Sequence, residues 1–216
     1  DNGFNVKVAT NLNNASGKEI KRLNDEGIHL VNFSFSRSSV NPFSNLFYLL
    51  KLIRIVKGSK PKNLALISSK PIIFGGLSRL FFKFDKVFYH ISGLGYSFIS
   101  NTKKARFLRH FILNMYKFLF RLRSSTVIFQ NKDDRNYFLQ EKVVNKSNSV
   151  VIRGNGIDVN RFRRKSYPTK TTFLFASRLL IDKGIIEYFE AAENLKNDQL
   201  SFLIAGGIDK DNPNSL

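Results

Sequence analysis

The sequence predicts an α/β protein whose parallel strands form doubly wound sheets. Short apolar segments alternate with amphipathic helical segments, and strands separated by helices pair in parallel. Hydrophobic residues make up 43% of the 216 residues, and 22 of them are phenylalanine, which is ample material for a core. The strand–helix pattern restarts near residue 171, which indicates the beginning of a second domain.

The expected elements follow from the spacing of apolar residues, which recur every three or four positions in helices and form short runs in strands. The expected strands span residues 5–9, 28–33, 64–67, 86–90, 126–129, 150–152, 172–176 and 200–205. The expected helices span residues 18–26, 45–57, 72–82, 105–122, 132–140 and 185 to about 195.

We therefore expect a first domain over 1–160, a linker over 161–170 and the start of a second domain over 171–216. Residues 1–4 resemble the last turn of a helix and its glycine stop. The chain also stops just after a strand. These features predict a fragment that lacks its first strand and helix and most of its second domain.

Composition narrows the classes of function. The chain has no cysteine, which excludes disulfides and thiolate metal sites and fits a reducing compartment. No apolar run approaches the ~18 residues that would span a bilayer. The net charge of +19 favours anionic partners: nucleic acid, anionic lipid headgroups or phosphorylated substrates.

The most informative segment is 177–184, which follows an apolar strand and opens an amphipathic helix. Such a junction directs free backbone N–H groups and the positive end of the helix dipole toward one point. Arg178 and Lys183 can flank that point, so the segment suits a diphosphate. The alternative is that both are ordinary loop charges of a basic protein.

In open parallel sheets, ligands bind beyond the carboxyl ends of the strands. Several unusual residues are expected there, although turns, caps and structural hydrogen bonds are alternative roles for His90, the glycines and Asp158. The candidates are Arg37, Lys70, His90, Gly93, Gly95, Asn155 and Asp158.

Segments 90–96, 154–162 and 177–184 together resemble the retaining, nucleotide-sugar-dependent glycosyltransferases of family four, which have the two-domain GT-B fold. The resemblance is greatest to members that build capsular, O-antigen or other lipid-linked surface polysaccharides. It runs over essentially the whole chain. The chain departs from the pattern in having Pro61-Lys62 and Ala65 where relatives carry Pro-Asp and a histidine.

The resemblance implies a role for each candidate. Arg178, Lys183 and Gly184 match the group that holds the donor diphosphate, and His90 matches the catalytic histidine that approaches the transferred sugar. The remaining candidates match the acceptor side of the cleft: Arg37, Lys70, Gly93, Gly95, Asn155 and Asp158. The Glu-containing donor segment of the family would lie beyond Leu216, so we expect the fragment alone to be inactive.

Fixed cations and a helix amino terminus can stabilise the charge that develops on a leaving diphosphate. The sequence shows no dense cluster of Asp, Glu and His at a strand end. We therefore expect a metal-independent enzyme with no cofactor, whose donor substrate is a nucleotide-diphosphate sugar.

Residues 101–125 carry seven cations and no acid. At about 100° per residue, the expected core-facing stripe of this helix is Leu108, Phe111, Ile112, Met115, Leu119 and Leu122. The opposite side combines Tyr116 and Phe120 with cations and is typical of a surface that docks on anionic lipid. The cations assigned to this membrane surface are Arg109, Lys117, Arg121 and Arg123. The alternative is a solvated basic face whose two aromatic residues are covered by a neighbouring element.

The sequence thus favours a glycosyltransferase with a lipid-linked glycan acceptor, cytoplasmic and peripheral on the inner face of the cell membrane. A UDP-sugar 2-epimerase of the same fold is an alternative, but it would require acid–base carboxylates that the strand ends before Asp158 lack. A basic nucleic-acid-binding module is a second alternative, for which charge alone predicts only nonspecific binding.

Overall fold

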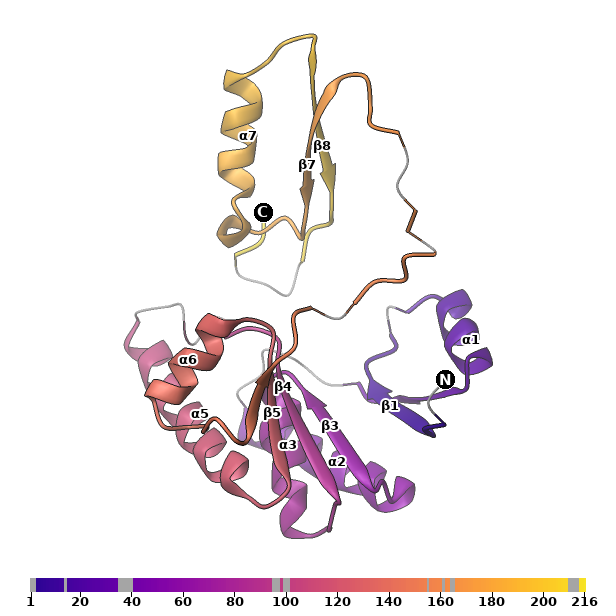
Figure 1. The fold of residues 1–216 in the computed structure, drawn as a ribbon, viewed down its shortest axis with the longest axis vertical. Helices are drawn as coiled ribbons and strands as arrows, with labels where there is room; N and C mark the ends of the chain where they lie inside the picture. Colours follow the sequence, from indigo (N-terminus) through magenta and orange to yellow (C-terminus); the bar gives the residue numbers. More distant parts are fainter. Residues whose placement is uncertain are drawn as a thin grey trace. The chain divides into compact units, whose positions relative to one another are not determined.

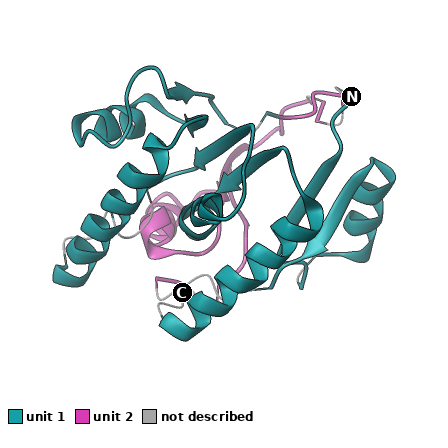
Figure 2. Cartoon of the chain, turned by 90° about the horizontal axis from the view of Figure 1, so that it is seen from below, with its two compact units in different colours: residues 1–156 teal, residues 157–216 magenta. Residues whose placement is uncertain are grey.

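The computed structural model describes residues 3–13, 15–34, 41–94, 98, 102–154, 156–160, 162, 163, 166–209 and 214–216. The chain divides into two compact units, residues 1–156 and 157–216 (Figure 2). Every strand pair in both units is parallel, so the predicted α/β class with parallel sheets is confirmed.

The first unit opens with a small β–α–β motif of β1 (Val6–Thr10), α1 (Gly17–Asp25) and β2 (Ile28–Asn32). A capping box starts α1: the Ser16 hydroxyl accepts from the Glu19 N–H at 3.2 Å, and the Glu19 carboxylate accepts from the Ser16 N–H. β1 and β2 form a two-stranded sheet of their own among the described residues, separate from the larger sheet that follows.

The larger sheet has the order β3-β4-β5-β6, and Figure 1 shows β3, β4 and β5 side by side. Its strands are β3 (Asn63–Ile67), β4 (Lys86–Ile91), β5 (Ser125–Phe129) and β6 (Ser149–Val151). The intervening helices are α3 (Ser69–Leu77), continued by the 3₁₀ turn η1 (Ser78–Leu80), α5 (Lys103–Arg121) and α6 (Lys132–Gln140). The helix expected at 72–82 begins three residues earlier, at Ser69, and its α-helical part ends five residues earlier, at Leu77. The 3₁₀ turn η1 continues it to Leu80.

Successive strands are added in one direction across this sheet. Because right-handed crossovers then place every connecting helix on the same face, α3, α5 and α6 share one core with one side of the strands. Tyr89 and Phe129 point from the sheet into this core and are fully buried. On the other face Ile67 and Val150 stay exposed.

Two adjacent glycines allow α3 to pack closely. A Cβ at Gly75 would collide with Leu66 of β3, and one at Gly76 would collide with Leu119 of α5. On its other side α3 contacts α2 (Pro42–Ser59), where the rings of Tyr48 and Phe74 lie 5.2 Å apart. α3 therefore lies between α2 on one side and α5 on the other.

The buried side of α5 differs from the expected stripe. Tyr116 and Phe120 are buried and stack on each other at 4.9 Å, whereas Phe111 is exposed. The fully buried or nearly buried residues of α5 are Ala105, Ile112, Tyr116, Leu119 and Phe120. The predicted stripe was confirmed for Ile112 and Leu119 and wrong for Phe111. The helix carries large apolar residues on every side, so spacing alone does not identify the face that meets α3 and α6.

The second unit contains β7 (Thr171–Ala176), the 3₁₀ turn η2 (Ile181–Lys183), α7 (Ile185–Asn194) and β8 (Leu200–Ala205). β7 and β8 pair in parallel from Thr171↔Leu200 to Ala176↔Ala205. The Tyr188 hydroxyl of α7 donates to the Leu203 carbonyl at 2.8 Å and so fastens the helix to the strands. This is the strand–loop–helix junction that segment 177–184 predicts.

Candidate functional site

In the second unit, the loop between β7 and α7 carries the predicted diphosphate-binding residues. Gly184 has a φ of 80°, a conformation that L side chains rarely adopt, and it serves as the N-cap of α7 without a side-chain cap. The first N–H groups of α7 therefore have no side-chain acceptor at the cap position. Lys183 ends η2 immediately before this point and is exposed.

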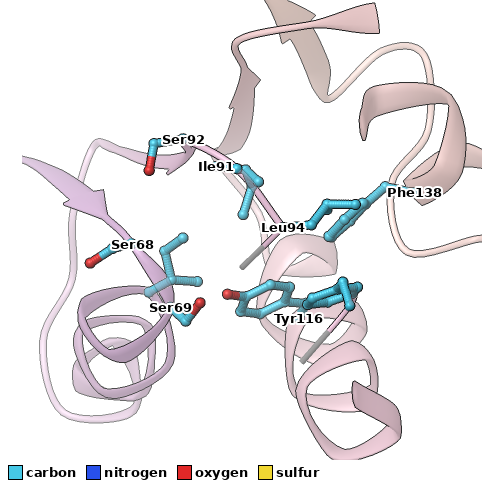
Figure 3. A pocket seen from close by; sticks show the side chains of 10 residues that line it. Ser68, Ser69, Ile91, Ser92, Leu94, Tyr116 and Phe138 are labelled. Carbon is cyan, nitrogen blue, oxygen red and sulfur yellow. The ribbon is translucent and has the colours of Figure 1, made fainter. Parts of the chain in front are cut away.

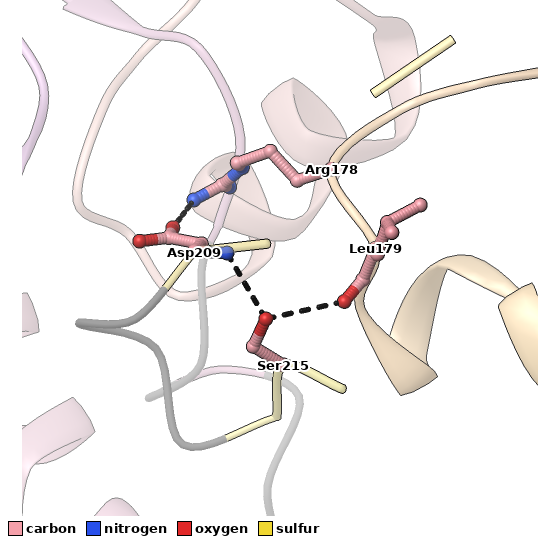
Figure 4. Close-up of polar contacts among 4 residues, drawn as sticks. All are labelled: Arg178, Leu179, Asp209 and Ser215. Carbon is pink, nitrogen blue, oxygen red and sulfur yellow. Dashed lines mark hydrogen bonds and ion pairs between the residues drawn. The ribbon is translucent and has the colours of Figure 1, made fainter. Parts of the chain in front are cut away.

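Arg178 forms an ion pair with Asp209, which follows β8 (Figure 4). The guanidinium side chain is still 56% exposed, so it has room for a second anionic partner. The Asp209 N–H donates to Ser215 Oγ at 3.0 Å, and that hydroxyl donates to the Leu179 carbonyl at 3.3 Å. The two loops at the carboxyl edge of this sheet are therefore cross-linked around Arg178.

A glycine makes this close approach possible. A Cβ at Gly206 would collide with the carbonyl oxygen of Ser177, so only glycine fits between the ends of β8 and β7. Sequence reasoning missed Asp209 and Ser215. The available signal was the pair Gly206-Gly207 directly after an apolar strand, followed by an acidic residue.

The first turn of α7 holds an acidic residue as well as the free N–H groups. Glu187 lies in this turn, and its Oε2 would be 3.7 Å from a Cβ built on Gly184. A negatively charged carboxylate near a helix amino terminus interacts favourably with the helix dipole. The same position would favour a diphosphate.

In the first unit, His90 lies within β4, one residue before its end, and not in the loop beyond the strand. It pairs in register with Ile67 of β3 and Ile128 of β5, on the face opposite the main core. Its Nε2 atom is buried and has no hydrogen-bond partner among the described residues. A buried polar atom without a partner costs about 1–3 kcal/mol, which makes this nitrogen a candidate for contact with a ligand.

Lys70 lies in the first turn of α3, at the carboxyl edge of β3, and burial lowers its pKa. Beside it is a small pocket of about 10 Å³, which has room for about one water molecule and is far below the ~300–1,000 Å³ of typical small-molecule sites. Figure 3 shows the Tyr116 hydroxyl directed toward Ser69 across this pocket, with Ser68 and Ser92 at its rim. Burial raises the pKa of Tyr116 to about 12, although the hydrogen bond with Ser69 opposes the shift.

The remaining acceptor-side candidates have mixed positions. Gly93 lines the same pocket and has a φ of 154°, which L side chains rarely adopt. The Asp158 carboxylate accepts from the Asn160 N–H at 2.9 Å, the local turn contact that the sequence left open as its alternative role. Three candidates lie outside the described residues: Arg37, Gly95 and Asn155.

The four cations assigned to the membrane surface do not share one environment. Arg109 is half-buried and its charge reaches Tyr137 of α6. Burial raises the pKa of Tyr137, and the positive charge of Arg109 offsets part of that rise. The Arg123 carbonyl accepts from the Arg79 guanidinium, while its side chain is exposed. Only Lys117 and Arg121 adjoin an exposed aromatic residue, Phe118, around a shallow groove.

No three His, Cys, Asp or Glu side chains gather as a metal site in the part of the chain that the structure describes. Within the same residues, every helix is too short or too polar to cross a membrane.

Comparisons with known proteins place this fold and sequence. The chain is 30% identical over 210 residues to the N,N'-diacetylbacillosaminyl-diphospho-undecaprenol alpha-1,3-N-acetylgalactosaminyltransferase of Campylobacter jejuni subsp. jejuni serotype O:2. That alignment covers 88% of this chain and 54% of the transferase, so the chain spans about half the length of this relative. No family model matches the chain.

Solved structures share the fold at low sequence identity. Sucrose-phosphate synthase from Thermosynechococcus elongatus matches with a TM-score of 0.64 and 16% identity, over 97% of this chain and 64% of that one. A glycosyltransferase from Rickettsia africae matches with a TM-score of 0.60 and 18% identity, over 93% and 52%. The S. aureus MnaA–UDP structure matches with a TM-score of 0.55 and 14% identity, over 92% and 54%.

The fold is thus the Rossmann-like α/β architecture of these proteins. In sequence, the chain is similar to a glycosyltransferase whose name specifies a diphospho-undecaprenol-linked acceptor.

Proposed function

We propose that the protein transfers a sugar, with retention of configuration, from a nucleotide-diphosphate sugar to a lipid-linked or polysaccharide acceptor. The observation that carries this proposal is the 30% identity, over 210 residues, to a transferase whose name specifies a diphospho-undecaprenol-linked acceptor. The fold shared with a glycosyltransferase and with a UDP-containing structure supports it.

The donor diphosphate is assigned to the junction of Arg178, Lys183 and Gly184. Breaking the sugar–diphosphate bond develops negative charge on the leaving group, and preorganised cations and N–H groups stabilise that charge. Asp209 holds the Arg178 side chain in place, so the guanidinium is ordered before the donor arrives. This arrangement needs no metal ion, and we propose that the reaction is metal-independent.

The acceptor is assigned to the first unit. The partnerless Nε2 of His90 would contact the transferred sugar, and Lys70 and Gly93 would line the acceptor side. The resemblance adds Arg37, Gly95, Asn155 and Asp158 to this side.

A lipid-linked acceptor places the enzyme at a membrane. We assign it to the inner face of the cell membrane, attached peripherally through its basic surface and without a specific nucleic-acid partner. The net charge of +19 supports attraction to an anionic bilayer.

The test is an assay of the purified protein with a panel of nucleotide sugars and a polyprenyl-diphosphate-linked glycan. Transfer of one sugar, with the donor's anomeric configuration kept in the product's NMR spectrum and unchanged by EDTA, is expected. Formation of a 2-epimer of the donor sugar, nucleotide-linked or released with water as a free sugar and UDP, in place of a longer glycan would favour the 2-epimerase alternative and overturn the proposal.

A further inference from the structure

α2 is apolar on both of its sides. Its inner side packs Tyr48, Leu52 and Val56 into the first unit. Its outer side exposes Phe43 (75%) and Phe47 (73%), with Leu46 and Leu50 half-exposed beside them. Residues spaced in this way lie along one face of a helix, so the exposed side chains form a continuous apolar stripe.

α5 exposes a comparable ridge. Phe107 is 77% exposed, and Phe111 and Phe118 are about half-exposed on the same side of the helix. Lys103 and Arg121 flank this ridge, because they lie four residues from Phe107 and three residues from Phe118. Lys117 borders the same shallow groove as Phe118 and Arg121. The buried Tyr116 and Phe120 lie on the opposite side.

The topology brings both aromatic faces to one edge of the unit. α2 ends at Ser59 shortly before β3 begins, and α5 ends at Arg121 shortly before β5 begins. Because each helix runs antiparallel to the strand that follows it, both helices begin at the carboxyl edge of the sheet. Phe43, Phe47, Phe107 and Phe111 lie in the first half of each helix, so they are nearer the edge where His90 and Lys70 also lie.

The charges select the chemistry of the partner. α2 contains three cations and α5 contains six, and neither helix has a carboxylate. Exposed phenylalanines interleaved with Lys and Arg suit the boundary between anionic headgroups and acyl chains. A protein surface covering these faces would have to supply acids for all of these cations.

We propose that the outer faces of α2 and α5 together form an aromatic docking surface for an anionic lipid bilayer. The surface inserts Phe43, Phe47, Phe107 and Phe111 at the headgroup boundary, while Lys117 and Arg121 contact the phosphates. This inference specifies the membrane attachment of the proposed function, yet lipid binding can be measured whether or not the transferase assay succeeds.

The chain has no tryptophan, so a single substitution gives a clean fluorescent reporter. F47W and F107W report on the two faces. F81W is the matched control, because Phe81 is 66% exposed in the same unit but follows η1 at the opposite edge of the sheet. Unchanged melting temperatures show that the variants fold.

With phosphatidylcholine vesicles containing phosphatidylglycerol, the emission of F47W and F107W should shift to the blue, and that of F81W should not. Pure phosphatidylcholine should give a smaller shift. A shift at F107W without one at F47W, or equal shifts at all three positions, overturns the two-helix surface. Emission that is already blue-shifted without vesicles means that protein covers the faces, and it also overturns the proposal.

A binding measurement provides the second readout. F43S/F47S and F107S/F111S should each weaken cosedimentation with the anionic vesicles at least tenfold, whereas F81S should bind as the parent does. K117Q/R121Q should remove most of the dependence of binding on salt. Unchanged binding in either double serine variant contradicts the assignment of that face.

Discussion

Arg178 and Asp209 are 31 residues apart in the sequence and form an ion pair between the loops that follow β7 and β8. Loops after adjacent parallel strands lie at the same edge of a sheet, which is where ligands bind in this fold class. The Ser215 hydroxyl accepts a hydrogen bond from the Asp209 N–H and donates one to the Leu179 carbonyl. The direction of the Arg178 side chain is therefore set by residues of both loops.

Arg178→Ala and Lys183→Ala should each cost about 2–4 kcal/mol of transition-state stabilisation, as does the loss of an oxyanion-hole donor. The reason is that the proposed donor site assigns both cations to the diphosphate. The measurement is kcat/KM for the nucleotide sugar. Lys196→Ala, at the exposed far end of α7, is the control for the loss of a positive charge. A kcat/KM within threefold of the parent's in both variants would contradict the assignment of the donor site.

Asp209→Asn should lower kcat/KM less than Arg178→Ala does, because Asp209 acts by positioning the guanidinium. In the Arg178→Ala background the same substitution should have almost no further effect, since its target is gone. A double-mutant cycle on kcat/KM measures this coupling. Additive losses would show that Asp209 acts independently of Arg178.

The sequence predicts the order of elements closely, because each strand and helix has a local cause. Strand β8 (Leu200–Ala205) coincides with the strand expected at 200–205. Helix α6 begins after Asn131, whose side chain accepts from the Asp134 N–H at 2.7 Å. The face of α5 was mispredicted because tertiary packing decides it. Gly76 lets α3 approach Leu119, and Tyr116 and Phe120 of the same helix are buried as well.

The candidate site is predictable only where it is local in sequence. Arg178, Lys183 and Gly184 belong to one loop–helix junction, so the pattern of residues identifies them together. Asp209 joins them through the pairing of β7 with β8, which no local pattern of residues reports. His90 was expected as the last residue of its strand, and the structure places it one residue before the end because β4 continues to Ile91.

His90→Ala should lower kcat far more than it raises the Kd for the donor, if the imidazole acts at the transferred sugar. Its Nε2 has no partner among the described residues, so the substitution breaks no hydrogen bond there. Kinetics and donor titration provide the two values, and the melting temperature provides the control. A fall in melting temperature as large as the fall in activity would favour a structural role.

Tyr116 makes the first unit sensitive to high pH. Burial raises its pKa to about 12, above the value near ~10 of a free tyrosine. Above about pH 10 the unfolded chain releases this proton while the folded chain keeps it, so the unfolded state becomes more favourable. The stabilising contribution is complete below about pH 10 and is lost as the pH rises through the folded pKa, at about 1.4 kcal/mol per pH unit.

Tyr116→Phe removes the titrating hydroxyl and keeps the ring that stacks on Phe120. Its free energy of unfolding should therefore fall less steeply than that of the parent between about pH 10 and 12, a difference of about 2–3 kcal/mol at the upper end. Part of the slope should persist, because burial also raises the pKa of Tyr48 and Tyr89. Urea unfolding followed by circular dichroism measures the slopes, and Tyr167→Phe, at an exposed position, is the matched control. Equal slopes in the parent and Tyr116→Phe would mean that this hydroxyl ionises as readily in the folded chain as in the unfolded one.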